Sequence, residues 1–199
     1  MTHLNKLLLT FSLLGASAMA HADDNFASLT LGQTSDKIKK STALSQHLGH
    51  PDTDAVIGKD TTYGLRLGLQ NDRRRVYATY DNVSGSHNGI KLRQENLLGS
   101  YDLFYPVSGT ARLFGGGSAG LAKLTQTSSG YSRDTDIGYA FGVQAGVLQK
   151  ISPNASVELG YRYLRSNAST EMSPHGGAKA GSLALTSSAQ TYLSANFTF

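Results

Sequence analysis

Several features are absent from this chain of 199 residues, and each absence narrows what it can be. There is no cysteine, so no disulfide can hold the fold together. There is no tryptophan, only 39% of the residues are apolar, and the mean hydropathy is -0.25, which excludes a bundle of spanning helices. The net charge of +4 comes from basic residues scattered along the chain without a stripe, so nothing indicates nucleic acid as a partner.

The N-terminal segment has the pattern of a secretory signal peptide. Lys6 precedes an apolar run over residues 7–14, and small residues end the segment at Ala20-His21-Ala22. The alternative is a membrane anchor, but the apolar run is well short of the roughly 18 to 20 residues that a spanning helix needs. We therefore expect residues 1–22 to be a signal peptide cleaved before Asp23, with residues 23–199 forming one domain.

The chain is rich in glycine and tyrosine, with 22 and 10 residues, and its side chains alternate in character with a period of two. The segment 62–70 shows this best: Tyr63, Leu65, Leu67 and Leu69 share one face, and small or polar residues share the other. Such alternation is typical of a two-faced strand. Eight segments of this kind are predicted, at residues 25–32, 62–70, 76–81, 96–105, 111–124, 137–147, 157–163 and 188–199.

The connections between these segments favour a closed barrel in a membrane. They are long after odd segments and short after even ones, apart from a modest loop at 84–89, as in membrane barrels with long external loops and short periplasmic turns. All four prolines fall between segments, where a missing N–H costs no ladder bond. The alternative is a soluble lipocalin-like barrel, but that fold turns its apolar side inward around a greasy ligand.

Two motifs carry a resemblance to a known family. The segment 189–199 alternates strictly and ends on Phe199, and the segment 151–164 contains an S-P-N turn followed by G-Y-R-Y. The chain resembles the OmpA-like and opacity-type outer-membrane proteins, over the whole of residues 23–199 in layout. The resemblance implies an all-β fold, an eight-stranded antiparallel up-and-down transmembrane β-barrel, in the outer membrane of a Gram-negative bacterium. One departure from the family is expected, namely that the protein consists of the barrel without a peptidoglycan-binding domain after Phe199.

The same resemblance implies partners. The β-barrel assembly machinery is expected to read the closing segment, through Tyr192, Phe197 and Phe199. Outer-membrane lipids and lipopolysaccharide are expected around the barrel.

A polar set of residues is expected inside the barrel. If the leucine, valine and tyrosine faces contact lipid, five charged residues point inward from four strands: Arg66, Asp102, Arg112, Glu158 and Arg162. Eight strands leave an interior that side chains just fill, and buried charges need partners. We expect these residues to lie at similar height in the periplasmic half and to form an ion-pair plug. The alternative is a gated pore or a proton path.

Catalysis and metal binding have little support in the sequence. The histidines beyond the signal, His47, His50, His87 and His175, fall in predicted external loops without the spacing of a ligand set. A lipid A hydrolase would need a serine and a histidine at the outer surface. Although His87 follows Ser84 and Ser86, no acyl groove is visible around it, so we expect no enzyme, no metal and no cofactor.

Basic residues collect where the outer rim is expected. They are Lys37, Lys39, Lys40 and Lys59 in the first predicted loop and Lys91, Arg93, Lys123, Arg133 and Arg165 near strand ends. These cations would lie at the height of lipopolysaccharide phosphates, and the alternative is that they only keep the protein soluble. The predicted external loops 34–60 and 167–185 take about a quarter of residues 23–199, which favours surface display. We therefore expect a role in envelope integrity, with adhesion to a host or polyanionic ligand as a further function.

Overall fold

The computed structural model describes residues 24–42, 56–87, 89–127, 131–174 and 181–199. The predicted signal peptide lies outside them, so cleavage before Asp23 stays a prediction, which N-terminal sequencing of the exported protein would test. The described chain forms nine strands: β1 (Asp24–Lys40), β2 (Gly58–Gln70), β3 (Arg74–His87), β4 (Ile90–Pro106), β5 (Ala111–Gln126), β6 (Asp134–Ser152), β7 (Ala155–Ser166), β8 (Ser169–Met172) and β9 (Gly181–Thr198).

These strands close into one antiparallel barrel. Each strand pairs with the next from β1 to β7, β7 pairs with β9, and β9 pairs with β1 from Phe26↔Thr198 to Lys40↔Leu183. The short β8 pairs with β9 beyond the end of β7, so it continues the course of β7 and the ring has eight strands. The predicted fold class is therefore confirmed.

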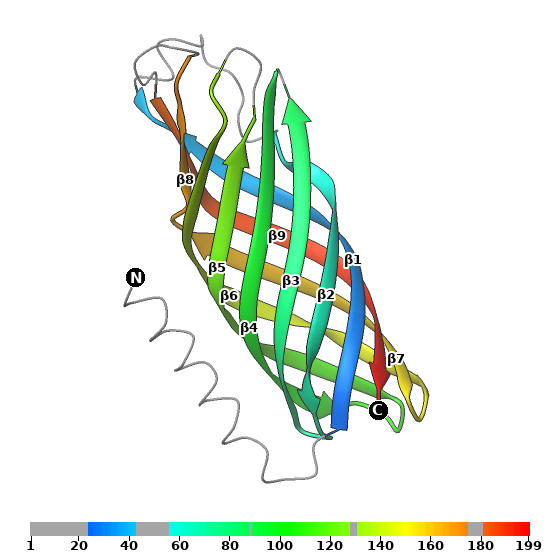
Figure 1. Ribbon diagram of the computed structural model, residues 1–199. Helices are drawn as coiled ribbons and strands as arrows, with labels where there is room; N and C mark the ends of the chain where they lie inside the picture. Colours follow the sequence, from blue (N-terminus) through cyan, green and yellow to red (C-terminus); the bar gives the residue numbers. More distant parts are fainter. Residues whose placement is uncertain (1–23, 43–55, 88, 128–130, 175–180) are drawn as a thin grey trace.

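The two ends of the barrel differ. The connections after β2, β4 and β6, of two to four residues each, lie at the same end as the start of β1 and the C-terminus (Figure 1). The longer connections after β1, β5 and β8 lie at the opposite end, together with the two-residue connection after β3. Asn25 and Phe199 exchange backbone hydrogen bonds of 3.2 and 2.9 Å at that first end. Because outer-membrane barrels have short periplasmic turns and longer external loops, we call the end with the termini periplasmic and the other external.

Most of the barrel length is apolar outside and polar inside. Leu29 is 63% exposed and Leu193 is 52% exposed, whereas Ser28 and Ser194, next to them in the chain, are 1% exposed. This arrangement suits a wall that faces hydrocarbon, and it agrees with the predicted faces. Within the part of the chain that the structure describes, no helix has the length and apolar character needed to cross a membrane.

The strands extend further toward the external end than the sequence indicated. Residues 34–40, 58–60, 84–87 and 181–185 were predicted as loop but belong to β1, β2, β3 and β9, and residues 169–172 form β8. The cause is that the apolar side chains of the strands point inward in this region and not outward. Ile38, Leu183 and Leu185 are buried inside the barrel, because beyond the membrane the outer wall faces water and apolar side chains gain from turning inward.

These inward apolar residues form a core at the external mouth, which we call the mouth cluster: Ile38, Val56, Ile57, Val83, Ile90, Leu92, Leu124, Ala168, Met172, Leu183 and Leu185. The segment before β2 enters the barrel here, where Asp36 N–H donates to Ile57 O at 2.8 Å. Gly85 allows this approach, since a Cβ at its position would lie 1.9 Å from Val56 O. The external mouth is therefore apolar, where a polar interior was expected. The rest of the interior holds many buried polar and charged side chains together with two smaller apolar clusters.

Candidate functional sites in the interior and on the outer rim

The centre of the barrel holds two arginines and two carboxylates in direct contact. Arg66 donates to Glu158 at 2.8 Å, and Arg75 reaches Glu158 at 2.5 Å and Asp102 at 2.7 Å. All four side chains are at most 1% exposed. Because Glu158 on β7 faces Arg66 on β2 and Arg75 on β3 across the lumen, these pairs join opposite walls. We call these four residues the interior cluster.

Neutral side chains add further hydrogen bonds to the interior cluster. Tyr192 O–H donates to Glu158 at 3.0 Å, Tyr77 O–H donates to Asp102 at 3.0 Å, and Gln144 donates to Asp102 at 2.7 Å. The Arg66 guanidinium lies 4.3 Å from the centre of the Tyr192 ring, a cation–π contact. With two positive and two negative charges and these hydrogen bonds, the cluster is balanced, as buried charges require.

A second buried pair lies nearer the external end. Arg162 is paired with Asp81 and also donates to Gln190 at 2.6 Å, while Asn96 donates to Asp81 at 2.6 Å. Arg162 was predicted to share a plug with Arg66 and Glu158. The structure places it inside the barrel but with a different acid, because it lies four residues, or two inward positions, further along β7 than Glu158.

Arg112 is separate from both buried pairs. It lies at the periplasmic mouth and pairs with Asp72, whose side chain is 86% exposed in the turn before β3. The hydrogen bond from Arg112 lowers the pKa of Asp72. The expectation that Arg112 belongs to the plug is therefore wrong. Arg112 is the second residue of β5, so it lies level with the periplasmic turns and not with the barrel centre.

The sequence reasoning missed Arg75 and Asp81. Arg75 follows Arg73 and Arg74, and the strand predicted over residues 76–81 begins one residue after it. The alternation of β3 contains the missing signal, because Arg75 shares the inward face of Tyr77 and Asp81. Extending the strand by one residue toward the turn would have placed Arg75 inside.

The closing strand separates the three residues of the predicted assembly signal. Phe197 and Phe199 are 53% and 73% exposed, while Tyr192 is 2% exposed and contacts the interior cluster. Gly160 on β7 accommodates the Tyr192 ring, since a Cβ there would lie 2.3 Å from its Cζ. Reading of this segment by the assembly machinery stays a prediction.

An ordered group of charges lies on the outer wall at the upper border of the apolar belt. Glu95 Oε1 accepts hydrogen bonds from Tyr80 O–H at 2.7 Å and from Arg93 at 3.1 Å. Lys123 Nζ lies 3.2 Å from the other carboxylate oxygen of Glu95, Oε2. We call these four residues the β4–β5 basic site. Leu97, two residues below Glu95 on the same face, is 57% exposed. The site carries one net positive charge directly above lipid-facing side chains.

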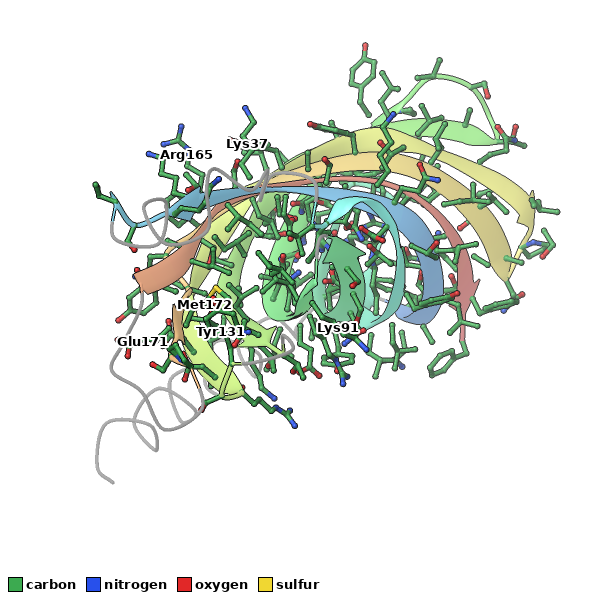
Figure 2. The ribbon with its side chains drawn as sticks, turned by 90° about the horizontal axis from the view of Figure 1, so that it is seen from above. Lys37, Lys91, Tyr131, Arg165, Glu171 and Met172 are labelled. Atoms are coloured by element: carbon green, nitrogen blue, oxygen red, sulfur yellow. The ribbon has the colours of Figure 1, made fainter. Side chains whose placement is uncertain are left out.

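The other predicted rim residues are also found on or near the outer surface. Exposed are Lys37, Lys39, Lys59, Lys91, Arg133 and Arg165, and Lys40 is half-buried. Viewed from above, Lys37 and Arg165 project from one side of the ring and Lys91 from the other (Figure 2). His47, His50 and His175 lie outside the described residues, as does the side chain of His87. Among the residues that are described, no three histidine, cysteine or acidic side chains could jointly hold a metal ion.

Comparison with known proteins identifies the family. The profile of the outer membrane protein β-barrel domain matches residues 7–194. The solution structure of outer membrane protein H (OprH) from Pseudomonas aeruginosa, determined in DHPC micelles, is 56% identical, with a TM-score of 0.56, over 88% of this chain and 99% of that one. Comparison with curated protein sequences gave no match.

Two further structures share the fold at low identity. Neisserial surface protein A is 13% identical, with a TM-score of 0.63, over 88% of this chain and 97% of that one. The attachment invasion locus protein Ail of Yersinia pestis is 14% identical, with a TM-score of 0.50, over 88% and 99%. With its closed ring of eight strands and its lipid-facing wall, this chain belongs to the outer membrane protein β-barrel family and is a protein of the Gram-negative outer membrane.

Proposed function

We propose that this barrel stabilises the outer leaflet of the outer membrane by binding lipopolysaccharide phosphates at its basic rim, without catalysis and without appreciable conductance. The observation that carries the proposal is the β4–β5 basic site. Glu95 holds Arg93 and Lys123 together on neighbouring strands, in a Glu95↔Lys123 register pair. Two cations held by one acid are preorganised for a further anion, whereas two freely moving cations would lose side-chain entropy on binding.

The position of this site selects a lipid ligand. Ile137 pairs with Lys123 on the next strand and is 60% exposed, and Leu97 lies below Glu95. A phosphate that reached Arg93 and Lys123 would therefore have apolar side chains beneath it, where acyl chains pack. A basic residue near an anionic lipid surface contributes about 1 kcal/mol, so a few such residues suffice to anchor several lipids around the barrel.

The interior supports a closed barrel. The interior cluster fills the centre with balanced, mutually bonded charges, and the mouth cluster places apolar side chains across the external opening. An ion would have to separate buried ion pairs and then cross an apolar layer, and both steps are unfavourable. The gated pore remains the competing interpretation of the same arginines and carboxylates.

Adhesion has less support than the sequence indicated. That expectation rested on the length of the loops 34–60 and 167–185, and strands now occupy residues 34–40, 58–60, 169–172 and 181–185. The remaining connections are shorter than predicted. Binding of a soluble polyanion is therefore an outcome of the test below and not a second proposal.

The test measures binding of lipopolysaccharide to the purified barrel in detergent micelles. We expect tight binding of phosphorylated lipopolysaccharide, weak binding of the enzymatically dephosphorylated form, and weaker binding by the double variant Arg93→Gln/Lys123→Gln. Lys150→Gln, an exposed cation at the periplasmic end, is the matched control and should bind as the wild type does. Equal binding of phosphorylated and dephosphorylated lipid would overturn the proposal.

Two parallel measurements separate the competing functions. Stepwise conductance in planar bilayers, sensitive to Arg66→Met, would establish the pore. Tight binding of sucrose octasulfate, the heparin analogue crystallised with Ail, in the absence of any preference for phosphorylated lipopolysaccharide, would instead establish a receptor for soluble polyanions. Release of fatty acid from lipid A by the purified barrel would show that it is an enzyme.

A further inference from the structure

A second group of cations lies on the wall opposite the β4–β5 basic site. Lys37 on β1 pairs in register with Ser187 on β9, and Ser187 pairs with Arg165 on β7, so the three residues form one row across three strands. Lys37 and Arg165 project outward side by side, on the far side of the ring from Lys91 (Figure 2). The two cations therefore belong to one surface, although 128 sequence positions separate them.

This row includes a covered hydroxyl and a phenol on the outer surface. Ser187 shares the outward face of Lys37 and Arg165, yet it is only 4% exposed. Tyr163, two residues below Arg165 on β7, shares that face and is half-buried. The charges of both Arg165 and Lys37 act on the Tyr163 hydroxyl, so the two cations lie near one phenol.

The charge of this row is not balanced. Neither Lys37 nor Arg165 forms an ion pair with an acid among the described residues, in contrast to Arg93 and Lys123, which share Glu95. Lys39 adds a further exposed cation two residues along the same face of β1. Two cations that influence the same phenol repel each other, so an anion bound between them would relieve that repulsion.

The surroundings point to an anion with an apolar tail. Phe141 on β6 pairs in register with Arg165 and is 59% exposed, and Tyr161, two residues below Tyr163 on β7, is 50% exposed. Aromatic side chains with the cations above them lie where membrane proteins meet lipid head groups. A soluble anion would leave Phe141 in water, whereas a phosphorylated lipid would cover it.

We infer that Lys37, Arg165 and Tyr163 form a second binding site for the phosphate of an outer-leaflet glycolipid, independent of the β4–β5 basic site. This inference rests on the proposed function, since it assigns the same class of ligand to a second wall. The barrel would then hold two phosphorylated lipids on opposite sides. In this second site Lys37 and Arg165 bind the phosphate, and the Tyr163 hydroxyl donates a hydrogen bond to it.

The experiment titrates the full-length mature barrel in micelles with hexa-acylated lipid A carrying both phosphates, and measures affinity and stoichiometry. Four proteins are compared: the wild type, Lys37→Gln/Arg165→Gln, Arg93→Gln/Lys123→Gln, and the quadruple variant. Each double variant removes two positive charges from one wall, so each is the matched control for the other. We expect the stoichiometry to fall from two to one in each double variant. Affinity at the altered wall should fall about thirtyfold, as expected for two cations that each contribute about 1 kcal/mol near an anionic lipid.

Two further arms identify the ligand and the role of the phenol. Tyr163→Phe keeps the ring but not the hydroxyl. It should weaken binding at this wall about threefold while the stoichiometry stays at two, consistent with the loss of one hydrogen bond to the phosphate. Inorganic pyrophosphate should compete weakly, because it cannot cover Phe141. If it binds as tightly as lipid A, the site takes soluble anions and the inference is wrong.

The outcomes separate this inference from the proposed function. If Arg93→Gln/Lys123→Gln abolishes all phosphate-dependent binding and Lys37→Gln/Arg165→Gln changes nothing, the second site does not exist and the proposed function stands. If the wild type binds lipid A with and without phosphates equally, both fail. Each protein is first checked for heat-modifiable migration, which shows that the barrel is folded.

Discussion

Arg75 offers the sharpest test of how the interior is held together. It is fully buried and is paired with both Asp102 and Glu158. In Arg75→Met, Glu158 keeps Arg66 and Tyr192, but Asp102 keeps only neutral hydrogen bonds from Tyr77 and Gln144. Removing one partner of a buried ion pair costs about 3 to 5 kcal/mol, because the other charge stays buried. We expect Arg75→Met to lower the free energy of unfolding by that amount.

The assay is reversible urea unfolding in phospholipid vesicles, followed by the fraction of the faster-migrating folded form in unheated gel electrophoresis. The double variant Arg75→Met/Asp102→Asn removes the orphaned charge as well and should recover most of the loss, since neutral replacement of both partners is often close to neutral in stability. The reasoning would be refuted if Arg75→Met lowered the free energy of unfolding by less than about 1 kcal/mol, or if the double variant recovered none of the lost stability. Either result would show that the buried, unpaired carboxylate does not determine the loss of stability.

Arg112→Met provides the matched control, with the same chemical change at a pair that faces water. The Arg112–Asp72 pair is exposed on the Asp72 side, so its loss should cost no more than about 1 kcal/mol. Because the Arg112 hydrogen bond lowers the pKa of Asp72, the pair contributes stability above the ordinary pKa of aspartate and loses that contribution as the pH falls through the lowered value. The difference between wild type and Arg112→Met should therefore vanish in acid.

Two other predictions concern the wall and the mouth. Val143→Arg puts a charge on the lipid-facing side, where it costs roughly 2 to 4 kcal/mol near the bilayer midplane. It should therefore reduce the heat-modifiable fraction in membranes, whereas the inward substitution Gln144→Asn should assemble. Equal assembly of the two variants would show that the inner and outer faces are exchanged. Gly85→Val should lower the urea midpoint, because its Cβ would meet Val56 O at 1.9 Å. Overpacking of this kind typically lowers the free energy of unfolding by about 1 to 3 kcal/mol. An unchanged midpoint would show that the segment before β2 does not enter the barrel. Its control is Gly115→Ala, whose Cβ meets nothing nearer than 4.0 Å.

The membrane-spanning part of the fold could be predicted from the sequence because one physical rule governs it. Leu65 and Val143 face outward toward hydrocarbon, and the residues next to them, Arg66 and Gln144, are buried inside the barrel. The sequence therefore alternates with a period of two. The short turns followed for the same reason, since turn residues interrupt that period at Asn71 and Pro106. This alternation, together with the expectation that the apolar faces contact lipid, predicts that Arg66, Asp102 and Glu158 lie inside the barrel.

Only the tertiary structure decided which buried charges meet, and where the wall leaves the membrane. Alternation gives the face of a residue but not its partner across the lumen, so it could not pair Arg75 with Glu158 or Arg162 with Asp81. Alternation also could not show that the apolar side chains point inward near Ile38. An alternating pattern is the same whether the outer face of the strand contacts hydrocarbon or water. The environment outside the wall, hydrocarbon below and water above, determines which face is apolar, and only the closed barrel shows where one gives way to the other.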